Sequence, residues 1–166
     1  EINVPIGRAT VRAKIWKLQV GRVPLYLLDC DVPENKPADR KLTHNLYGGD
    51  NEHRIRQEVL LGVGGMMALD ALKEDVTVHH LNEGHAAFAG LERVRRLVEA
   101  GHDFEDAVQE VRKGSVFTTH TPVPAGNDRF DVPMFSKYMV GYARAMGIPK
   151  KQLLALGRED ESDANE

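Results

Sequence analysis

The alternation of apolar and polar positions near the start of the chain predicts a β-hairpin. Residues 10–20 alternate with a period of two, which is typical of a strand, although neither face is cleanly apolar. Residues 23–30 form a second and more apolar run, and Gly21 and Arg22 separate the two runs. Because glycine tolerates the backbone conformations that a tight turn requires, we expect Gly21 to close a hairpin between these strands.

Farther along, apolar residues recur with the spacing of amphipathic helices. A loop containing Pro33 and Pro37 is expected over residues 31–40. A wide apolar face then predicts a long helix over residues 52–72. Further helices are predicted over residues 86–100, 104–112 (capped by Asp103), 133–146 and 150–156, followed by an acidic, frayed end over residues 157–166.

Glycines mark both the ends and the interior of these helices. Gly101 and Gly147 follow the last apolar residues of two helices, where a left-handed residue commonly ends a helix. Gly62, Gly64 and Gly65 lie inside the long helix, where each costs about 1 kcal/mol relative to alanine. A close approach of another backbone explains such glycines better than helix propensity does. The cluster resembles a phosphate-binding loop only superficially, because no Lys-Ser or Lys-Thr follows it.

Two short apolar runs, residues 76–81 and 115–119, predict buried strands that each lead into a polar loop. The order strand, two helices, strand is that of a βαβ unit, so we expect parallel strands with a right-handed crossover. The loops then meet at the carboxyl ends of the strands, where open α/β sheets bind ligands. Two strands and a hairpin make a thin sheet, and we expect neighbouring strands to lie outside residues 1–166.

Composition and charge narrow the class of protein. The 166 residues are 42 % hydrophobic and 28 % charged, which suits a single globular piece over residues 1–166. A net charge of -3 gives no reason to expect nucleic acid or an anionic membrane as a partner. The single Cys30 cannot form an internal disulfide, and no apolar run reaches the roughly 20 residues of a membrane span. A cytoplasmic location is the expectation, and the missing initial Met suggests a longer parent protein.

His120 is the first candidate for chemistry, because it follows an apolar strand within Thr119-His120-Thr121. A histidine there can donate to a ligand hydroxyl while its other ring nitrogen is oriented by a partner. Glu83, which follows the preceding strand, is the expected partner. The alternative is a histidine that only braces its loop.

Glu83 and His85 also lie where a strand meets a helix N-terminus, whose unpaired N–H groups favour oxygen atoms. Glu83 could therefore serve only as a helix cap. Asp50 and Asn51 precede the long helix, and they could cap it or face a polyol ligand. Capping is the simpler interpretation for Asp50 and Asn51.

A metal site built from His79, His80, Glu83 and His85 is disfavoured by the spacing. Successive strand residues point to opposite faces, so at most one of His79 and His80 can join the other two. No HExxH or CxxC pattern is present in the sequence. We expect no metal ion.

Four segments, in order, resemble the α-glucan (glycogen, starch or maltodextrin) phosphorylases, particularly the shorter prokaryotic type. They are QVGRVPLYLLD at 19–29, LYGGD at 46–50 with RIRQE at 54–58, HLNEGH at 80–85, and FTTHTPVPAG at 117–126. The resemblance covers almost the whole chain.

The resemblance implies a two-domain glycosyltransferase of the GT-B type with Rossmann-like domains and an active site between them. Such enzymes use inorganic phosphate to remove terminal glucose from an α-1,4-glucan, with retention, releasing α-glucose 1-phosphate. The resemblance also implies pyridoxal phosphate, whose phosphate group assists proton transfer and whose lysine lies in the C-terminal domain. This chain then forms an interior piece of the N-terminal domain, a Rossmann-like parallel-sheet fragment with a β-hairpin near its start.

Site residues follow from the resemblance at matching positions. His120 resembles the family histidine whose backbone carbonyl lies near the reacting centre of the sugar, where it would face a developing positive charge. Thr121 resembles its neighbour in the pocket wall. Glu83 stands where many members have Asp, a carboxylate that orients the histidine.

The remaining site residues are expected to contact the sugars. Asp50 and Asn51 resemble the gate loop that precedes the helix carrying Arg54, and this loop is shorter than in animal enzymes. His85 resembles a residue that lines the path of the acceptor sugar.

The glycine-rich phosphate loop, expected upstream, and the cofactor lysine, expected downstream, are absent from the sequence. We therefore expect the chain alone to be inactive and the parent protein to be a homodimer that binds α-1,4-glucan and phosphate. Open sheet edges also predict self-association of the chain. The alternatives are a maltodextrin-binding module without turnover and an inert structural fragment.

Overall fold

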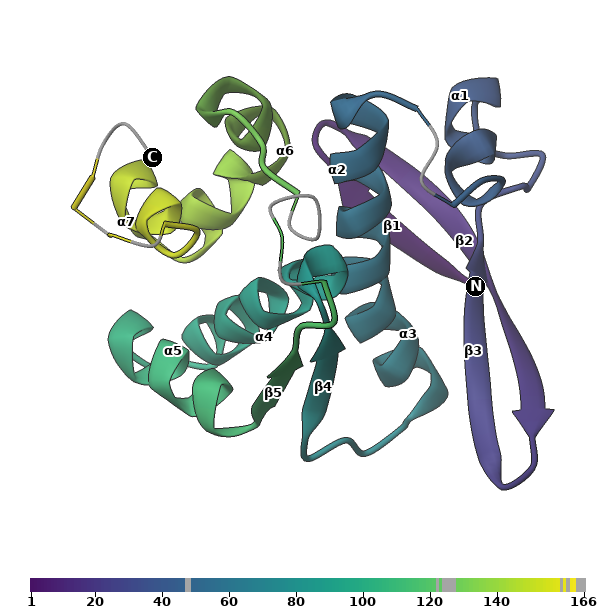
Figure 1. Ribbon diagram of the computed structural model, residues 1–166, viewed down its shortest axis with the longest axis horizontal. Helices are drawn as coiled ribbons and strands as arrows, with labels where there is room; N and C mark the ends of the chain where they lie inside the picture. Colours follow the sequence, from purple (N-terminus) through teal and green to yellow (C-terminus); the bar gives the residue numbers. More distant parts are fainter. Residues whose placement is uncertain (47–48, 122, 124–127, 159, 161, 164–166) are drawn as a thin grey trace.

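The chain folds into a mixed α/β arrangement with two separate sheets (Figure 1). The structure is a computed structural model, and it describes residues 1–46, 49–121, 123, 128–158, 160 and 162–163. The strands are β1 (Ile2–Ile6), β2 (Ala9–Val20), β3 (Val23–Asp29), β4 (His79–Asn82) and β5 (Ser115–Thr118). The α-helices are α1 (Pro37–Arg40), α2 (Asn51–Val59), α3 (Gly65–Leu72), α4 (Phe88–Glu99), α5 (Phe104–Lys113), α6 (Val132–Ala145) and α7 (Lys150–Ala155). Three further turns of helix are η1 (Lys41–Thr43), the π-helical η2 (Leu60–Gly64) and η3 (Gly84–Ala86).

The predicted hairpin is confirmed as the antiparallel pair β2–β3, and Gly21 in its turn has the expected positive φ of 60°. The strand β1 is not among the predicted elements, and it pairs with β2 on the side opposite β3. Ile2, Val4 and Ile6 of β1 are buried while the residues between them are exposed. This alternation was a readable signal in the sequence.

The segment 31–40 is not a loop throughout, because its last four residues form α1. Pro37 begins this helix, a position where the missing N–H of proline costs nothing and its fixed φ suits the helix. The buried Asp39 accepts a hydrogen bond from Arg56 and so joins α1 to α2. Proline signalled a helix start here rather than a loop.

The long helix predicted over residues 52–72 is a run of α2, η2 and α3 in which helical geometry never breaks. A Cβ atom at Gly62 would lie 2.6 Å from the backbone nitrogen of Ala89, which confirms the expected close approach at this glycine. At Gly64 a Cβ atom would lie 3.0 Å from a methyl group of Val4. The same expectation is wrong for Gly65, where nothing lies within 4 Å.

The strands β4 and β5 are parallel, as the βαβ order predicts, with His80 opposite Val116. The prediction of a buried strand over residues 76–81 is wrong in two respects. The strand begins only at His79, and Val76 and Val78 are 39 % and 56 % exposed. A sheet of two strands offers too little cover to bury both of its faces.

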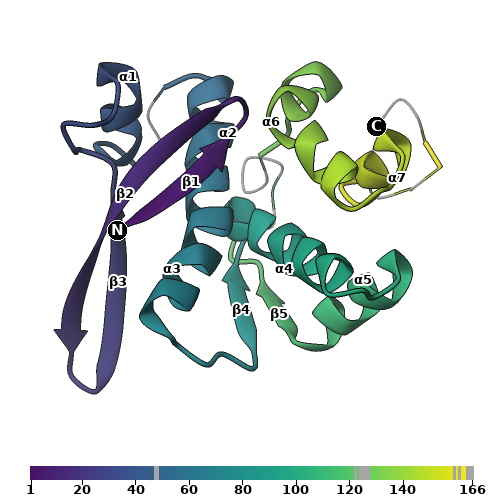
Figure 2. The ribbon, with the colours of Figure 1, turned by 180° about the vertical axis from the view of Figure 1, so that it is seen from behind.

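The helices after β4 match their predictions closely. Asp103 caps α5 by accepting from the N–H of Glu105, and Gly101 and Gly147 have positive φ values after α4 and α6. In both views α6 and α7 lie on the side of the molecule opposite the β2–β3 hairpin (Figure 1, Figure 2). The frayed end predicted over residues 157–166 lies partly outside the described residues. Among the described helices, none has the length and apolar character needed to cross a membrane.

Candidate functional site

The carboxyl ends of β4 and β5 meet at a single polar junction. The N–H of Glu83 donates to the carbonyl of Thr118 at 2.8 Å and so extends the ladder by one step beyond the strands. The carboxylate of Glu83 then accepts the backbone N–H of His120 at 2.9 Å. One side chain therefore holds together the two loops that the sequence identified as functional.

Glu83 is held in an unusual conformation to make this contact. Its φ of 58° and ψ of -167° lie in a region that is almost reserved for glycine, and the side chain is buried. Contacts with the Thr121 side chain, and then with the N–H of His120, lower the pKa of Glu83. A buried, ionised carboxylate thus lies beneath the loop that carries His120 and Thr121.

Two expectations for Glu83 need correction. Its side chain makes no capping hydrogen bond to η3, so the interpretation as a helix cap is wrong. It contacts His120 through the main chain, whereas we expected it to orient the imidazole ring. The ring of His120 is exposed.

A second group of polar residues centres on Arg54, on α2. Its Nε donates to Oδ2 of Asp128 at 2.8 Å, and its Nη2 lies 2.6 Å from Nδ1 of His85. Because a guanidinium only donates, Nδ1 of His85 must be an acceptor, which leaves its proton on Nε2. That nitrogen lies 3.8 Å from the carboxylate of Glu83, so His85 links the two polar groups.

Glu58 completes this group from the next turn of α2. It is 5 % exposed, and its Oε1 lies 3.3 Å from Nε of Arg54. Burial, and then the neighbouring Asp128, raise the pKa of Glu58 to about 8. Burial would raise the pKa of Asp128 as well, but hydrogen bonds from Glu58 and Arg54 outweigh burial and lower it. At neutral pH Glu58 is therefore protonated and Asp128 ionised.

Glu58, His85 and Asp128 have the residue types of a metal site, and their ligand atoms lie within 4.8 Å of one another. The guanidinium of Arg54 already lies among them, hydrogen-bonded to both His85 and Asp128. A cation would meet this positive charge and a protonated Glu58. The group suits hydroxyl groups, which both donate and accept, better than a metal ion.

The remaining predicted site residues are only partly brought to this group. Asp50 caps α2 by accepting from the N–H of His53 at 2.8 Å, which confirms the capping interpretation, and Asn51 is the first residue of that helix. Both are exposed. The predicted segments 46–50 and 117–126 also include residues 47–48, 122 and 124–127, which lie outside the described residues.

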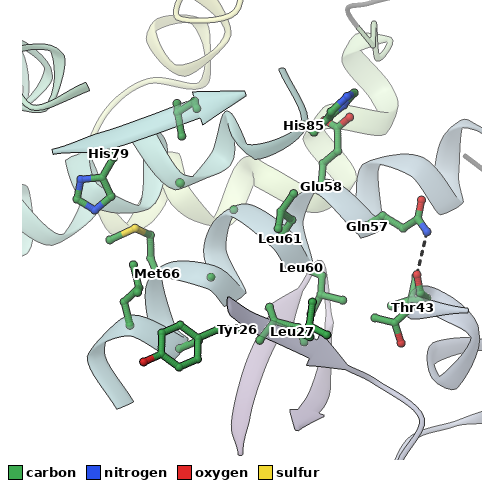
Figure 3. A pocket seen from close by; sticks show the side chains of 18 of the residues that line it. Tyr26, Leu27, Thr43, Gln57, Glu58, Leu60, Leu61, Met66, His79 and His85 are labelled. Atoms are coloured by element: carbon green, nitrogen blue, oxygen red, sulfur yellow. Dashed lines mark hydrogen bonds between the residues drawn. The ribbon is translucent and has the colours of Figure 1, made fainter. Parts of the chain in front are cut away.

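A groove of about 740 Å³ begins at this group and extends between β3 and β4 (Figure 3). Glu58 and His85 lie at one end, and His79 and Tyr26 lie on opposite sides of the other end, with Met66 between them. Its walls are largely aliphatic.

Sequence reasoning missed Glu58 and Asp128. Glu58 had a usable signal, because it follows Arg54 by four residues and so shares its helix face. Asp128 had none, since it meets Arg54 only through the tertiary fold.

Three curated proteins are similar to this chain over most of its length. The glycogen phosphorylase of Mycobacterium tuberculosis (strain H37Rv) is 51 % identical over 96 % of the chain and 20 % of its own length. The maltodextrin phosphorylase of Thermococcus litoralis is 47 % identical over 96 % of the chain and 19 % of its own length. The glycogen phosphorylase of Aquifex aeolicus is 35 % identical over 89 % of the chain and 21 % of its own length.

The chain spans about a fifth of the length of these relatives. No protein-family model matches it. No solved structure matches it either.

Proposed function

We propose, from the membership of this chain in the α-glucan phosphorylase family, that the whole protein is a retaining glucosyltransferase. It would cleave the bond between C1 of the terminal glucose and the 4-oxygen of the next residue of an α-1,4-glucan. A new bond forms between C1 and an oxygen of inorganic phosphate, the 4-oxygen of the shortened glucan gains the proton that the phosphate loses, and α-glucose 1-phosphate is released. The observation that carries the proposal is the 51 % identity over 96 % of the chain to a glycogen phosphorylase.

We assign the chain to the interior of the N-terminal domain of a GT-B-type enzyme. The parallel pair β4–β5, with its polar residues at the carboxyl ends, supports this assignment, because α/β domains bind ligands there. The chain alone would lack the facing half of the active-site cleft. We therefore expect it to be inactive by itself.

His120 would act through its backbone carbonyl, whose negative end would face the positive charge that develops at C1. The same peptide unit carries the N–H of Thr121, and both the side chain and the backbone of Thr121 interact with Glu83. A carboxylate near that N–H polarises the carbonyl at the other end of the peptide. Glu83 would thus be a positioning residue that holds and polarises the His120 carbonyl.

Arg54 and His85, held together by their contact, would bind sugar hydroxyl groups next to this peptide. Asp50 and Asn51 would approach the substrate from the start of α2. These roles are supported by residue type and by the shared junction at the strand ends.

Pyridoxal phosphate would supply a phosphate group that assists proton transfer to and from the substrate phosphate. Within the described part of the chain no lysine lines the groove or contacts the polar group around Arg54, so these residues do not fit a Schiff-base site. The cofactor would be held by the rest of the protein. We further propose a cytoplasmic homodimer with α-1,4-glucan and phosphate as its substrates.

The test is phosphate-dependent release of glucose 1-phosphate from maltodextrin by the whole protein. Glu83→Ala should lower kcat by about 100-fold, in the range seen when one electrostatic contact to a transition state is removed. Glu83→Asp should restore most of the activity, and Glu99→Ala, at an exposed position on α4, should have no effect. His120→Ala, which keeps the carbonyl, should lower activity less than Glu83→Ala does.

Each outcome has a distinct meaning. Release of free glucose without phosphate would contradict the proposed reaction. Full activity in Glu83→Ala would be consistent with the proposed reaction but would contradict the proposed role of Glu83.

A further inference from the structure

Glu58 is the least exposed member of the polar group that it forms with Arg54, His85 and Asp128. Its side chain is 6 % exposed, whereas that of Asp128 is 35 % exposed. Glu58 follows Arg54 by four residues on α2, so the helix holds both side chains on one face. Figure 3 shows Glu58 beside His85 at one end of the groove. A residue in this position acts on a ligand mainly through its neighbours.

One nitrogen of Arg54 faces two carboxyl groups. The Nε of Arg54 donates its single proton to Oδ2 of Asp128 at 2.8 Å, and Oε1 of Glu58 lies 3.3 Å from the same nitrogen. Within the described part of the chain, this Oε1 is buried and accepts no hydrogen bond. Because a buried, ionised oxygen without a donor is strongly destabilised, the geometry favours the protonated form of Glu58.

The carboxyl groups of Glu58 and Asp128 are hydrogen-bonded to each other. Two ionised carboxylates repel each other, so this bond exists only while one of them carries a proton. Glu58 carries it, since its side chain is the more deeply buried of the two. The O–H of Glu58 therefore holds Asp128 in place beside Arg54.

Ionisation of Glu58 would rearrange the residues around it. Among the described residues, the titratable and charged groups that face Glu58 are Arg54 on its own helix, His85 in η3 and Asp128 before α6. A second negative charge would repel Asp128 and attract the guanidinium of Arg54 toward Oε1. Asp128 can turn toward water because its side chain is partly exposed, whereas Glu58 cannot. The bond between Arg54 and Asp128 would then be lost.

The contacts that depend on this bond are those that suit a sugar. With Glu58 protonated, the group offers hydroxyl groups the donors of Arg54, the oxygens of Asp128 and the Nε2–H of His85. Groups that are already in place bind a ligand without the entropic cost of ordering them. If only the protonated arrangement binds, the apparent affinity falls with the fraction of protein that is protonated.

We propose that Glu58 is a positioning residue for the glucan, and that the glucan binds to the form of the protein in which Glu58 carries its proton. The proposal rests on the proposed function, because it takes the group around Arg54 as part of the sugar-binding site. It adds a residue that acts through Asp128 and Arg54, and it couples the binding of an α-1,4-glucan to one proton.

Calorimetric titration of the whole protein with maltoheptaose, at pH 7 and at pH 9, tests the coupling. With the pKa of Glu58 at about 8, about a tenth of the protein is protonated at pH 9, so Kd should rise about 10-fold between the two pH values. Binding should also take up about one proton per molecule at pH 9 and almost none at pH 7. The dependence of the heat on the buffer measures this uptake, and maltoheptaose itself has no group that titrates in this range.

Two substitutions identify the group that takes up the proton. Glu58→Gln keeps a hydrogen-bond donor and cannot ionise, so its Kd should be the same at both pH values, with no proton taken up. Glu99→Gln removes an exposed carboxylate from α4 and is the matched control, which should keep the wild-type behaviour. A residue that only stabilised the fold would change unfolding and not the proton uptake on binding. Should Glu58→Gln fail to fold, the proton uptake of the wild-type protein at pH 9 decides.

The outcomes separate this proposal from the proposed reaction. Equal Kd values at the two pH values, without proton uptake, would contradict the role of Glu58 and leave the reaction intact. Proton uptake that persists in Glu58→Gln would assign the coupling to another group and overturn the proposal. No binding at either pH would overturn the sugar site and the role of Glu58 together. Coupled binding by a protein that releases no glucose 1-phosphate would support the role of Glu58 and contradict the reaction.

Discussion

The two ends of the groove differ in how far this chain completes them. At the strand ends, Arg54, His85, Asp128 and Glu83 are each in contact with another member of the group or with a neighbouring loop. Between β3 and β4, backbone groups, aliphatic side chains and the ring of His79 face a groove. The contacts at one end are formed within residues 1–166, whereas β3 and β4 each have one unpaired edge among the described residues.

The polar group and the sheets differ in how much of the polypeptide each one requires. The polar group draws on three segments, 54–58, 83–85 and 128, which the helices and the β4–β5 pair bring together. A sheet instead needs neighbours on both sides of every central strand. A chain can therefore form a preorganised polar group and still have open strand edges.

Removal of Arg54 should produce the largest loss of stability, because Arg54 contacts both Asp128 and His85. Its side chain is 14 % exposed, and Arg54→Met would remove its hydrogen bonds to His85 and to Asp128, whose side chain is 35 % exposed. A hydrogen bond to a charged group contributes about 1.5–3 kcal/mol, and the exposure of Asp128 reduces its share, so the loss of both bonds should lower the free energy of unfolding by about 3–4 kcal/mol. Urea unfolding at pH 7 measures the change.

Arg22→Met is the matched control, since Arg22 lies exposed in the hairpin turn, and it should change stability by less than about 0.5 kcal/mol. Equal effects of the two substitutions would mean that the polar group does not stabilise the fold.

The second largest expected effect is a pH dependence of the stability, which comes from the protonation of Glu58. Its pKa is about 8 in the folded chain against an ordinary value of 4.5, so folding favours the protonated form. The stabilisation is complete below about pH 4.5 and is lost as the pH rises through 8, which lowers stability by roughly 3 kcal/mol between pH 5 and pH 9. Glu58→Gln, which cannot ionise, should remove this slope.

The difference between the wild-type and Glu58→Gln curves isolates the effect of Glu58. His79 titrates in both proteins, and the lowered pKa of Asp128 places its own loss of stability at acid pH, outside this window. Parallel curves from pH 5 to pH 9 would show that Glu58 is ionised in the folded chain.

The sequence predicted the elements better than their surroundings. The hairpin, the parallel pair and the four helices after β4 followed from periodicity and from glycine and aspartate caps. Burial of residues 76–81 was wrong, because an apolar run reveals that a segment needs cover and not whether this chain supplies it.

The sequence predicted where the site residues lie in the fold, but it predicted their hydrogen-bond partners less well. His85, Glu83 and His120 came together because the carboxyl ends of parallel strands share one edge. That Glu83 bonds the main chain of His120, and that Asp128 meets Arg54, depends on loop conformations that no local pattern encodes. The roles of these residues in catalysis stay predictions.

Gly62 lies where the floor of the groove touches the start of α4, so it connects the two regions. A Cβ atom there would lie 2.6 Å from the nitrogen of Ala89 and 2.8 Å from Cβ of Phe88, contacts that backbone movement alone can relieve. Gly62→Ala should therefore destabilise the chain by about 2 kcal/mol, as overpacking does. Thermal unfolding measures the loss, and an unchanged Tm would contradict the close packing of η2 on α4.

Gly65 gives the smallest effect and the most direct contrast with Gly62. It lines the groove, and nothing lies within 4 Å of the position its Cβ would take, so Gly65→Ala should stabilise the 166-residue chain by about 0.5–1 kcal/mol. Gly90, inside α4 and off the groove, is equally open, and Gly90→Ala should give a similar gain. Thermal unfolding measured for both substitutions decides, and a loss at Gly65 beside a gain at Gly90 would mean that the groove is closed over Gly65.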